Sequence, residues 1–308
     1  MNDTDQDVDY KSLALNVSLN INYLNKSLKE IKRLGKMADG MINFTQAVSH
    51  IFFIVSIIPL MEQVFDPDIN GIAAIYRARL NPKNEIFSQE SEISYNIINP
   101  SIIIDGRFNG VKEPVFYGSL QLVTNKPDPV LTAMIECCKT IFVINELDEY
   151  KKFTIGQWQV LTKFRVFNLC FDERHLILNS VLKTAKENFL ILIRSKFDEK
   201  SWQFIERFHN YFSRYCTNNG PYFLTNALIF AIKMRHNQKF NGIIYPSAMT
   251  EGKGLNIFLN TNSCDNFLSL SQVRMVKCSS MGNEINFEPC SDIIPVFNGQ
   301  FDFGAEPC

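Results

Sequence analysis

Two arginines on one predicted strand are the first residues whose spacing suggests chemistry. Arg77 and Arg79 stand two positions apart in the run Tyr76-Arg77-Ala78-Arg79. Because side chains alternate along a strand, both guanidinium groups would project from the same face. A guanidinium can meet two phosphate oxygens with parallel N–H donors, so the pair is a candidate phosphate clamp. An ordinary solvated edge strand would show the same pattern, and both interpretations stay open.

A glycine-flanked turn and a tyrosine that follows it form the second candidate. Residues 106–110 read Gly-Arg-Phe-Asn-Gly, with Arg107 and Asn109 as the polar side chains, and Tyr117 lies seven residues beyond the turn. Glycines let a backbone approach a ligand closely, and a phenol on a strand can stack against a planar heterocycle. A plain surface turn would have the same sequence as this turn, and a tyrosine in the core would look like Tyr117, so these alternatives also stay open.

A single carboxylate on an apolar helix is the third candidate. Glu136 is the only charged side chain between Asp128 and Lys139. A buried carboxylate without a partner is costly, so this side chain either reaches the wet side of its helix or is held in place for a purpose.

A serine at the end of a predicted strand is the fourth candidate. The strand-like run 242–246 leads into Tyr245-Pro246-Ser247, where the proline fixes a bend and presents the hydroxyl at the strand end. The chain has no Gly-x-Ser-x-Gly elbow, so a serine-hydrolase nucleophile is not supported. Ser247 is interpreted as a hydrogen-bonding residue.

Several other kinds of site are not indicated. The four histidines are isolated in sequence and lack a second ligand at metal spacing, so we expect no metal. Glycine-rich phosphate loops are absent. The formal net charge is −1 and the basic residues are dispersed, which argues against a general nucleic-acid binder. A small ligand or a protein partner is expected instead.

The elements that must position these residues follow from periodicity. Apolar residues recur at helical spacing over 10–34, a second apolar region reaches residue 65, and turn-forming residues then indicate a boundary near residue 70. Helix 130–139, capped by Asp128, carries Glu136. Strands are predicted at 72–80, 101–105, 115–123, twice within 153–169, and at 242–245, 256–259 and 273–277. Further helices are predicted at 180–194, 200–216 and 221–236.

The sequence also predicts a compartment. The apolar run 51–60 has about half the length needed to cross a bilayer, so it is expected to be a buried segment. The first residues are polar and acidic, unlike a secretory signal. Eight cysteines without a Cys-x-x-Cys pair favour reduced thiols, and a cytoplasmic protein is expected.

Taken in order, the four candidates resemble the RES family. The resemblance spans about residues 72–259 and rests on Tyr76-Arg77, Gly106-Arg107-Phe108-Asn109, Tyr117, Glu136 and Tyr245-Pro246-Ser247. It implies an α+β fold whose mixed or antiparallel sheet core is similar to that of ADP-ribosyltransferases. The catalytic domain would be 71–308, with a helical N-terminal extension at 1–70 and a helical insertion at about 172–240.

The resemblance further implies a toxin that consumes NAD by glycohydrolysis, phosphorolysis or ADP-ribosyl transfer. NAD would be the substrate, no metal would be needed, and an antitoxin or immunity protein would be a partner. In this interpretation Glu136, Arg77 and Ser247 are catalytic, and the NAD-binding residues are Tyr117, Arg107, Asn109, Arg79 and Tyr245. Glu136 would stabilise the oxocarbenium-like state. The alternative is a catalytically inactive module that binds a nucleotide or another protein.

Overall fold

The first elements of the chain are two long helices. The computed structural model describes residues 9–37, 40–68, 74–82, 85–122, 128–138, 150–177, 179–217, 222–236, 240–281 and 284–304. Helix α1 (Tyr10–Leu34) covers the predicted range, and the Asp9 carboxylate caps it by accepting from the Ser12 N–H. Helix α2 (Met41–Ile57) contains most of the apolar run that was expected to be buried.

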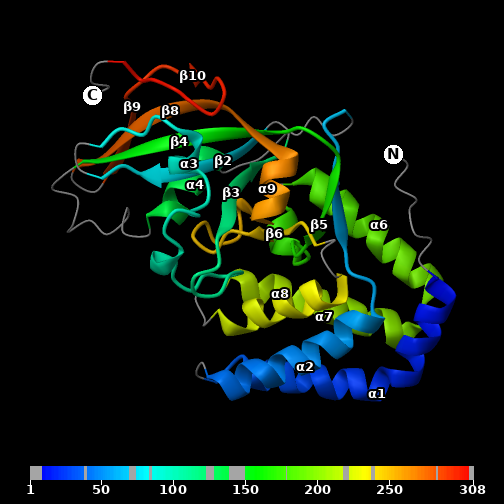
Figure 1. Cartoon of the computed structure of the whole chain (residues 1–308). Coiled ribbons are helices and arrows are strands. Elements are labelled where there is room, and N and C mark those ends of the chain that lie inside the picture. The colour runs from blue at the N-terminus through cyan, green and yellow to red at the C-terminus, as the bar shows by residue number, and fades with distance from the viewer. Residues whose placement is uncertain are drawn as a thin grey trace.

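Among the described residues, ten strands form one sheet, which occupies the upper part of the view in Figure 1. The strands are β1 (Glu62–Phe65), β2 (Ala74–Leu80), β3 (Val115–Gln121), β4 (Lys151–Val160), β5 (Phe164–Asn168), β6 (Gly242–Pro246), β7 (Leu255–Asn260), β8 (Leu268–Met281), β9 (Glu284–Pro289) and β10 (Ile294–Pro295). Their order is β1-β5-β6-β7-β3-β2-β4-β8-β10, and β9 also pairs with β8. The β5–β6 pair is parallel and the other described pairs are antiparallel. The fold is therefore α+β with a mixed, largely antiparallel sheet.

Helices cover this sheet and connect its strands. The remaining α-helices are α3 (Glu90–Ile93), α4 (Pro129–Cys137), α5 (Glu173–Leu176), α6 (Ser180–Lys196), α7 (Glu199–Thr217), α8 (Phe223–His236) and α9 (Thr261–Phe267). In Figure 1, α7 and α8 lie between the sheet and the pair α1–α2. The predicted helices at 180–194, 200–216 and 221–236 thus correspond to α6, α7 and α8.

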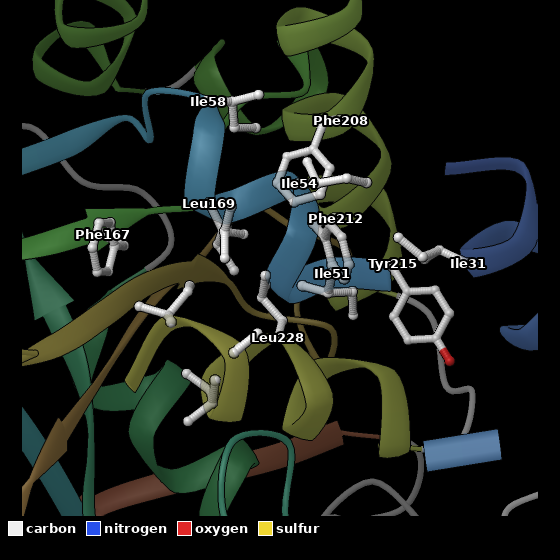
Figure 2. Close-up of a cluster of buried hydrophobic side chains, with 14 of the residues drawn as sticks. Ile31, Ile51, Ile54, Ile58, Phe167, Leu169, Phe208, Phe212, Tyr215 and Leu228 are labelled. Atoms are coloured by element: carbon white, nitrogen blue, oxygen red, sulfur yellow. The ribbon is translucent and has the colours of Figure 1, made fainter. Parts of the chain in front are cut away.

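One large hydrophobic cluster joins the N-terminal helices to the rest of the molecule. Figure 2 shows Ile51 and Ile54 of α2 beside Phe212 of α7 and Leu228 of α8. All four side chains are fully buried or nearly so. Strand β1 also precedes residue 70 and pairs with β5 at the edge of the sheet. The predicted boundary near residue 70 lies outside the described residues, and the division into an extension and a catalytic domain stays a prediction.

The strand predicted at 101–105 is wrong. The structure has a 3-10 turn there, η1 (Pro100–Ile102), followed by irregular chain. Pro100 occupies the first position of the turn, where its fixed φ and missing N–H are tolerated. Ile102 and Ile104 are exposed, so this apolar run has no core to pack against.

The structure bears on two expectations from the sequence, the state of the cysteines and the absence of a membrane-spanning helix. Cys290 takes part in a disulfide bond, so the expectation of eight reduced thiols is wrong at this residue, whereas six other described cysteines are free. No helix among the described residues is long and apolar enough to cross a membrane.

Strands β2 and β3 pair along only half of their length. They pair from Ala74↔Gln121 to Tyr76↔Ser119, and the described register ends there. Beyond this point β2 continues along β4, and β3 continues along β7. The two strands therefore diverge, and we call the divergence after Tyr76 and Ser119 the fork.

Candidate functional site

A cavity of about 280 Å³ lies at the fork. Strand β2 contributes residues 76–79 to its wall, strand β3 contributes residues 117–119, and helix α4 contributes Glu136 and Cys137. Ala133 of α4 also lines it, and the other lining residues are Arg107, Tyr222, Tyr245, Met249 and Asn256. Most of the residues predicted from the sequence therefore face one space, although they come from distant parts of the chain.

Glu136 is the centre of a hydrogen-bond network in this cavity. Its Oε1 accepts from the Ser247 hydroxyl at 2.6 Å and from the Asn256 amide at 2.7 Å. The Asn256 carbonyl oxygen in turn accepts from the Ser119 hydroxyl at 3.0 Å. The three residues of this network, Ser247, Asn256 and Ser119, are all buried. The carboxylate is therefore held by groups that cannot rotate freely. Of the two alternatives for Glu136, the held carboxylate is the one observed.

A tight turn after β6 places Ser247. The Ser247 N–H donates to the Gly254 carbonyl, and the Ser247 carbonyl accepts from the Gly252 N–H. Gly252 has φ +81°, a conformation that favours glycine. The hydroxyl is thereby directed at Glu136 on α4. Ser247 is not among the residues that line the cavity, and its contact with the site is the hydrogen bond to Glu136.

Arg77 spans the fork. Its Nε donates to the Ile93 carbonyl at 3.0 Å, and one terminal nitrogen donates to the Tyr117 carbonyl. The Tyr117 carbonyl belongs to the part of β3 that has no pairing with β2. Burial lowers the pKa of Arg77 to about 9, so the side chain is still charged at neutral pH. Arg77 thus lines the cavity, but its donors are largely engaged with the protein backbone.

Arg79 lies on the same side of β2 and resembles Arg77 in this respect. One of its terminal nitrogens donates to the Ser94 carbonyl, just after the end of α3. Its Nε is buried and has no hydrogen-bond partner in the described part of the chain. The arginine pair predicted on one face exists, yet it reaches two consecutive carbonyls next to α3 rather than an open edge.

Arg107 differs from the other two arginines. It lies in the loop before β3 and lines the cavity. Its guanidinium carbon stands 5.2 Å from the centre of the Tyr222 ring. Within the described ranges no hydrogen bond or ion pair engages its side chain. Arg107 is therefore the arginine whose donors are available to a ligand.

Tyr117 and Asn109 support each other. The Tyr117 hydroxyl donates to Asn109 Oδ1 at 2.9 Å and accepts from the Phe108 N–H at 2.8 Å. Asn109 is buried and does not line the cavity, so its observed role is to hold the loop and the phenol. Burial raises the pKa of Tyr117 far above its usual range, and the phenol stays neutral. Tyr117 lines the cavity from β3.

Tyr245 lines the cavity together with Glu136. Its ring meets Phe108 edge to face, with centroids 4.6 Å apart. Burial, reinforced by the negative charge of Glu136, raises the pKa of Tyr245 well above its usual range. The residue is almost completely buried, so it shapes the cavity more than it exposes a polar group.

Sequence reasoning did not assign a role to several residues of the site. These are Ser119, Cys137, Tyr222, Met249 and Asn256. Asn256 and Ser119 lie within ordinary strand sequences, and nothing in their local spacing points to Glu136. A polar residue predicted on a buried strand was the signal available for Asn256, which lies at the start of the predicted strand 256–259 and is buried in β7.

Neither a metal-binding group within the described residues nor a matching relative accounts for the cavity. Among the described residues, no group of histidine, cysteine, aspartate or glutamate side chains is placed to hold a metal ion. No protein-family model matches the chain, and no curated protein is similar to it. The resemblance to the RES family therefore stays a prediction.

Proposed function

We propose that the protein cleaves the bond between nicotinamide and ribose in NAD, as an enzyme of the RES type whose fold is similar to that of ADP-ribosyltransferases. The observation that carries this proposal is the fixed Glu136 carboxylate in a cavity that also contains arginine and tyrosine side chains. Cleavage develops positive charge on the ribose, and a carboxylate held in advance stabilises such charge without reorganisation.

The second oxygen of Glu136 is the part of the carboxylate available to a substrate. Both hydrogen bonds from the protein go to Oε1, and Oε2 has no partner in the described part of the chain. A ribose 2-hydroxyl can donate to this oxygen, and such a bond strengthens as the oxocarbenium ion forms. Ser247 and Asn256 then act by aiming the carboxylate, which supports a positioning role for Ser247.

The leaving group is consistent with a single carboxylate. Glycosidases that expel an alkoxide use a second carboxylic acid to protonate it. Glu136 is the one acidic side chain among the described residues that line this cavity. Nicotinamide departs from the NAD ribose as a neutral pyridine and requires no proton. The site therefore fits a nicotinamide glycoside better than an ordinary sugar glycoside.

The arginines divide their work in this proposal. Arg107 binds the diphosphate because its donors are uncommitted, and Arg79, which also lines the cavity, adds positive charge near it. Arg77 keeps the fork open and adds positive potential. The resemblance placed Arg77 among the catalytic residues and Arg107 among the NAD-binding residues, so Arg107 keeps its expected role and Arg77 changes to a supporting one. Tyr117 offers its ring to the nicotinamide.

Nicotinamide release from NAD by the purified protein tests the proposal. Glu136→Gln should still bind NAD but lose about a hundredfold or more in turnover. Glu187→Gln, which removes an exposed carboxylate of α6, is the matched control and should behave like the wild type. If Glu136→Gln keeps full turnover, the assignment is wrong. If the wild type binds NAD without releasing nicotinamide, the inactive binding module is the correct interpretation.

The acceptor of the ADP-ribose is a separate question. Mass spectrometry of the products, with and without phosphate and with a labelled NAD, distinguishes water, phosphate and a macromolecule as acceptors. An antitoxin or immunity protein as partner and a cytoplasmic location stay predictions.

A further inference from the structure

We infer that Tyr222, which directly precedes α8 in the predicted helical insertion, is a positioning residue of the ligand site and acts by orienting Arg107. The inference deepens the proposed function, because it names a residue outside the four sequence motifs that prepares the cavity for the diphosphate. It rests on two sets of contacts that join Tyr222 and α8 to the loop that carries Arg107, and on a third set that holds Tyr222 itself in place.

The first contact is the stacking of Arg107 on Tyr222. The guanidinium carbon lies 5.2 Å from the ring centroid, and both residues line the cavity. An arginine attracted to an aromatic face keeps its in-plane N–H donors free, because the ring contacts only the face of the guanidinium. The N–H donors of Arg107 are thus left free for a ligand in the cavity that both residues line.

The second set of contacts ties the loop to α8 on both sides of Arg107. Ahead of it, the Asn226 amide donates to Asp105 at 2.8 Å. After it, Lys233 forms an ion pair with Glu113, which also accepts from the Gly110 N–H at 3.0 Å. Asn226 and Lys233 lie seven residues apart on α8, so one helix face holds the whole loop.

The third set fixes Tyr222 itself. Its carbonyl accepts from the Asn226 N–H and from the Thr225 hydroxyl, each at 2.9 Å, which makes Tyr222 part of the first turn of α8. The same helix packs against α2, and Arg235 near its end donates to the Ile58 carbonyl after α2. The ring beneath Arg107 is thus supported through α8 by the N-terminal helices.

A double-mutant cycle tests whether Tyr222 acts through Arg107. The measured quantity is the affinity for ADP-ribose by titration calorimetry, which does not depend on turnover. Tyr222→Leu should weaken binding about fivefold to thirtyfold in the wild-type background. In an Arg107→Ala background the same change should have almost no effect. Tyr222→Phe keeps the aromatic face and should therefore retain the energetic coupling to Arg107 that Tyr222→Leu loses.

Tyr150→Leu is the matched control. Tyr150 also has cationic groups over its ring, with Lys277 Nζ at 4.5 Å, but it does not line the cavity. Its removal should leave the affinity unchanged.

The outcomes are distinguishable. If the wild type binds ADP-ribose but Tyr222→Leu binds equally well, or is equally harmful with and without Arg107, the role of Tyr222 is wrong while the proposed function stands. If the wild type binds neither ADP-ribose nor NAD, the proposed function and this inference are both wrong.

Discussion

At the scale of single residues, the three arginines show how the same side chain serves different purposes. Arg77 donates to two backbone carbonyls at the fork, whereas the side chain of Arg107 has no hydrogen bond or ion pair within the described ranges. An arginine that satisfies buried carbonyls contributes to stability, because its loss leaves those acceptors unpaired. An arginine with open donors contributes to ligand affinity.

These roles predict that two alanine substitutions affect different properties, one the stability of the protein and the other its affinity for a ligand. Arg77→Ala should lower the free energy of unfolding by about 3 kcal/mol, since hydrogen bonds to charged groups contribute about 1.5–3 kcal/mol each. Arg107→Ala should leave stability almost unchanged and weaken the affinity for ADP-ribose. Urea unfolding and calorimetric titration of both variants check this pair. Equal loss of stability in the two proteins would contradict the division.

Asn256 gives a second prediction at this scale. Asn256→Ala removes a 2.7 Å donor from Glu136 and leaves the Ser119 hydroxyl without its acceptor. The carboxylate loses its fixed direction, so kcat for NAD cleavage should fall about tenfold to a hundredfold with little change in KM. Asn266→Ala, on the exposed side of α9, is the control. An unchanged kcat would show that Ser247 alone suffices to hold Glu136.

The sequence predicted these residues unevenly, and the reason is physical. Glu136 stood out because one charge in an apolar helix must find a partner, and its partners Ser247 and Asn256 are buried as that argument requires. Arg77 is hydrogen-bonded to the backbone because β2 and β3 stop pairing beside it. Arg107 lies against Tyr222, which is far from it in the sequence. Such contacts leave no mark in local spacing.

At the scale of elements, helices were easier to predict than strands. The 3.6-residue periodicity of α1 is set by the residues of that helix alone, and its predicted range matches the observed Tyr10–Leu34. The run 101–105 has the apolar composition of a strand but no neighbour to pair with, and it forms no strand. Strand order is likewise set by packing among distant segments, and periodicity could not give it.

A histidine between two elements predicts a pH dependence of stability. On α7, His209 shares a hydrogen bond with the Ile205 carbonyl through Nδ1, and its Nε2 accepts from the Met61 N–H just before β1. Burial lowers the pKa of His209 to about 4, from an ordinary value of 6.5. The unfolded chain therefore binds this proton more readily than the folded chain does. Stability from the neutral ring is complete above pH 6.5 and is lost as the pH falls toward 4.

The size of this effect is about 3 kcal/mol across that window. Urea unfolding at a series of pH values measures it. His209→Gln keeps an acceptor for the Met61 N–H without a titrating group, so its free energy of unfolding should fall less steeply between pH 6.5 and 4. Comparison at pH 8 removes the direct cost of the substitution. Parallel curves for the two proteins would show that His209 is not responsible.

At the scale of the whole molecule, the hydrophobic cluster that joins α1, α2, α7 and α8 predicts cooperative unfolding. Side chains from these helices and from β5 and β6 are buried together, so separating the N-terminal helices would expose the core of the others. The two tryptophans lie in different layers: Trp158 is buried in β4 and Trp202 lies on α7.

A Trp202→Phe protein allows this prediction to be measured with two probes. Its fluorescence comes from Trp158 in the sheet, and its circular dichroism at 222 nm reports mainly the helices. Both signals should change at the same urea concentration. Two separate midpoints would indicate that the helical and sheet layers unfold independently.

The fork carries one more consequence. Neighbouring strands tend to pair along their whole length, but the pairing of β2 with β3 stops after Tyr76 and Ser119. Just beyond this point the Arg77 guanidinium, instead of a backbone N–H of β2, donates to the Tyr117 carbonyl. The position of the opening is thus set by the register at which β2 and β3 stop pairing. Shortening or extending the β2–β3 pairing is therefore a design route to a site for a larger or a smaller molecule.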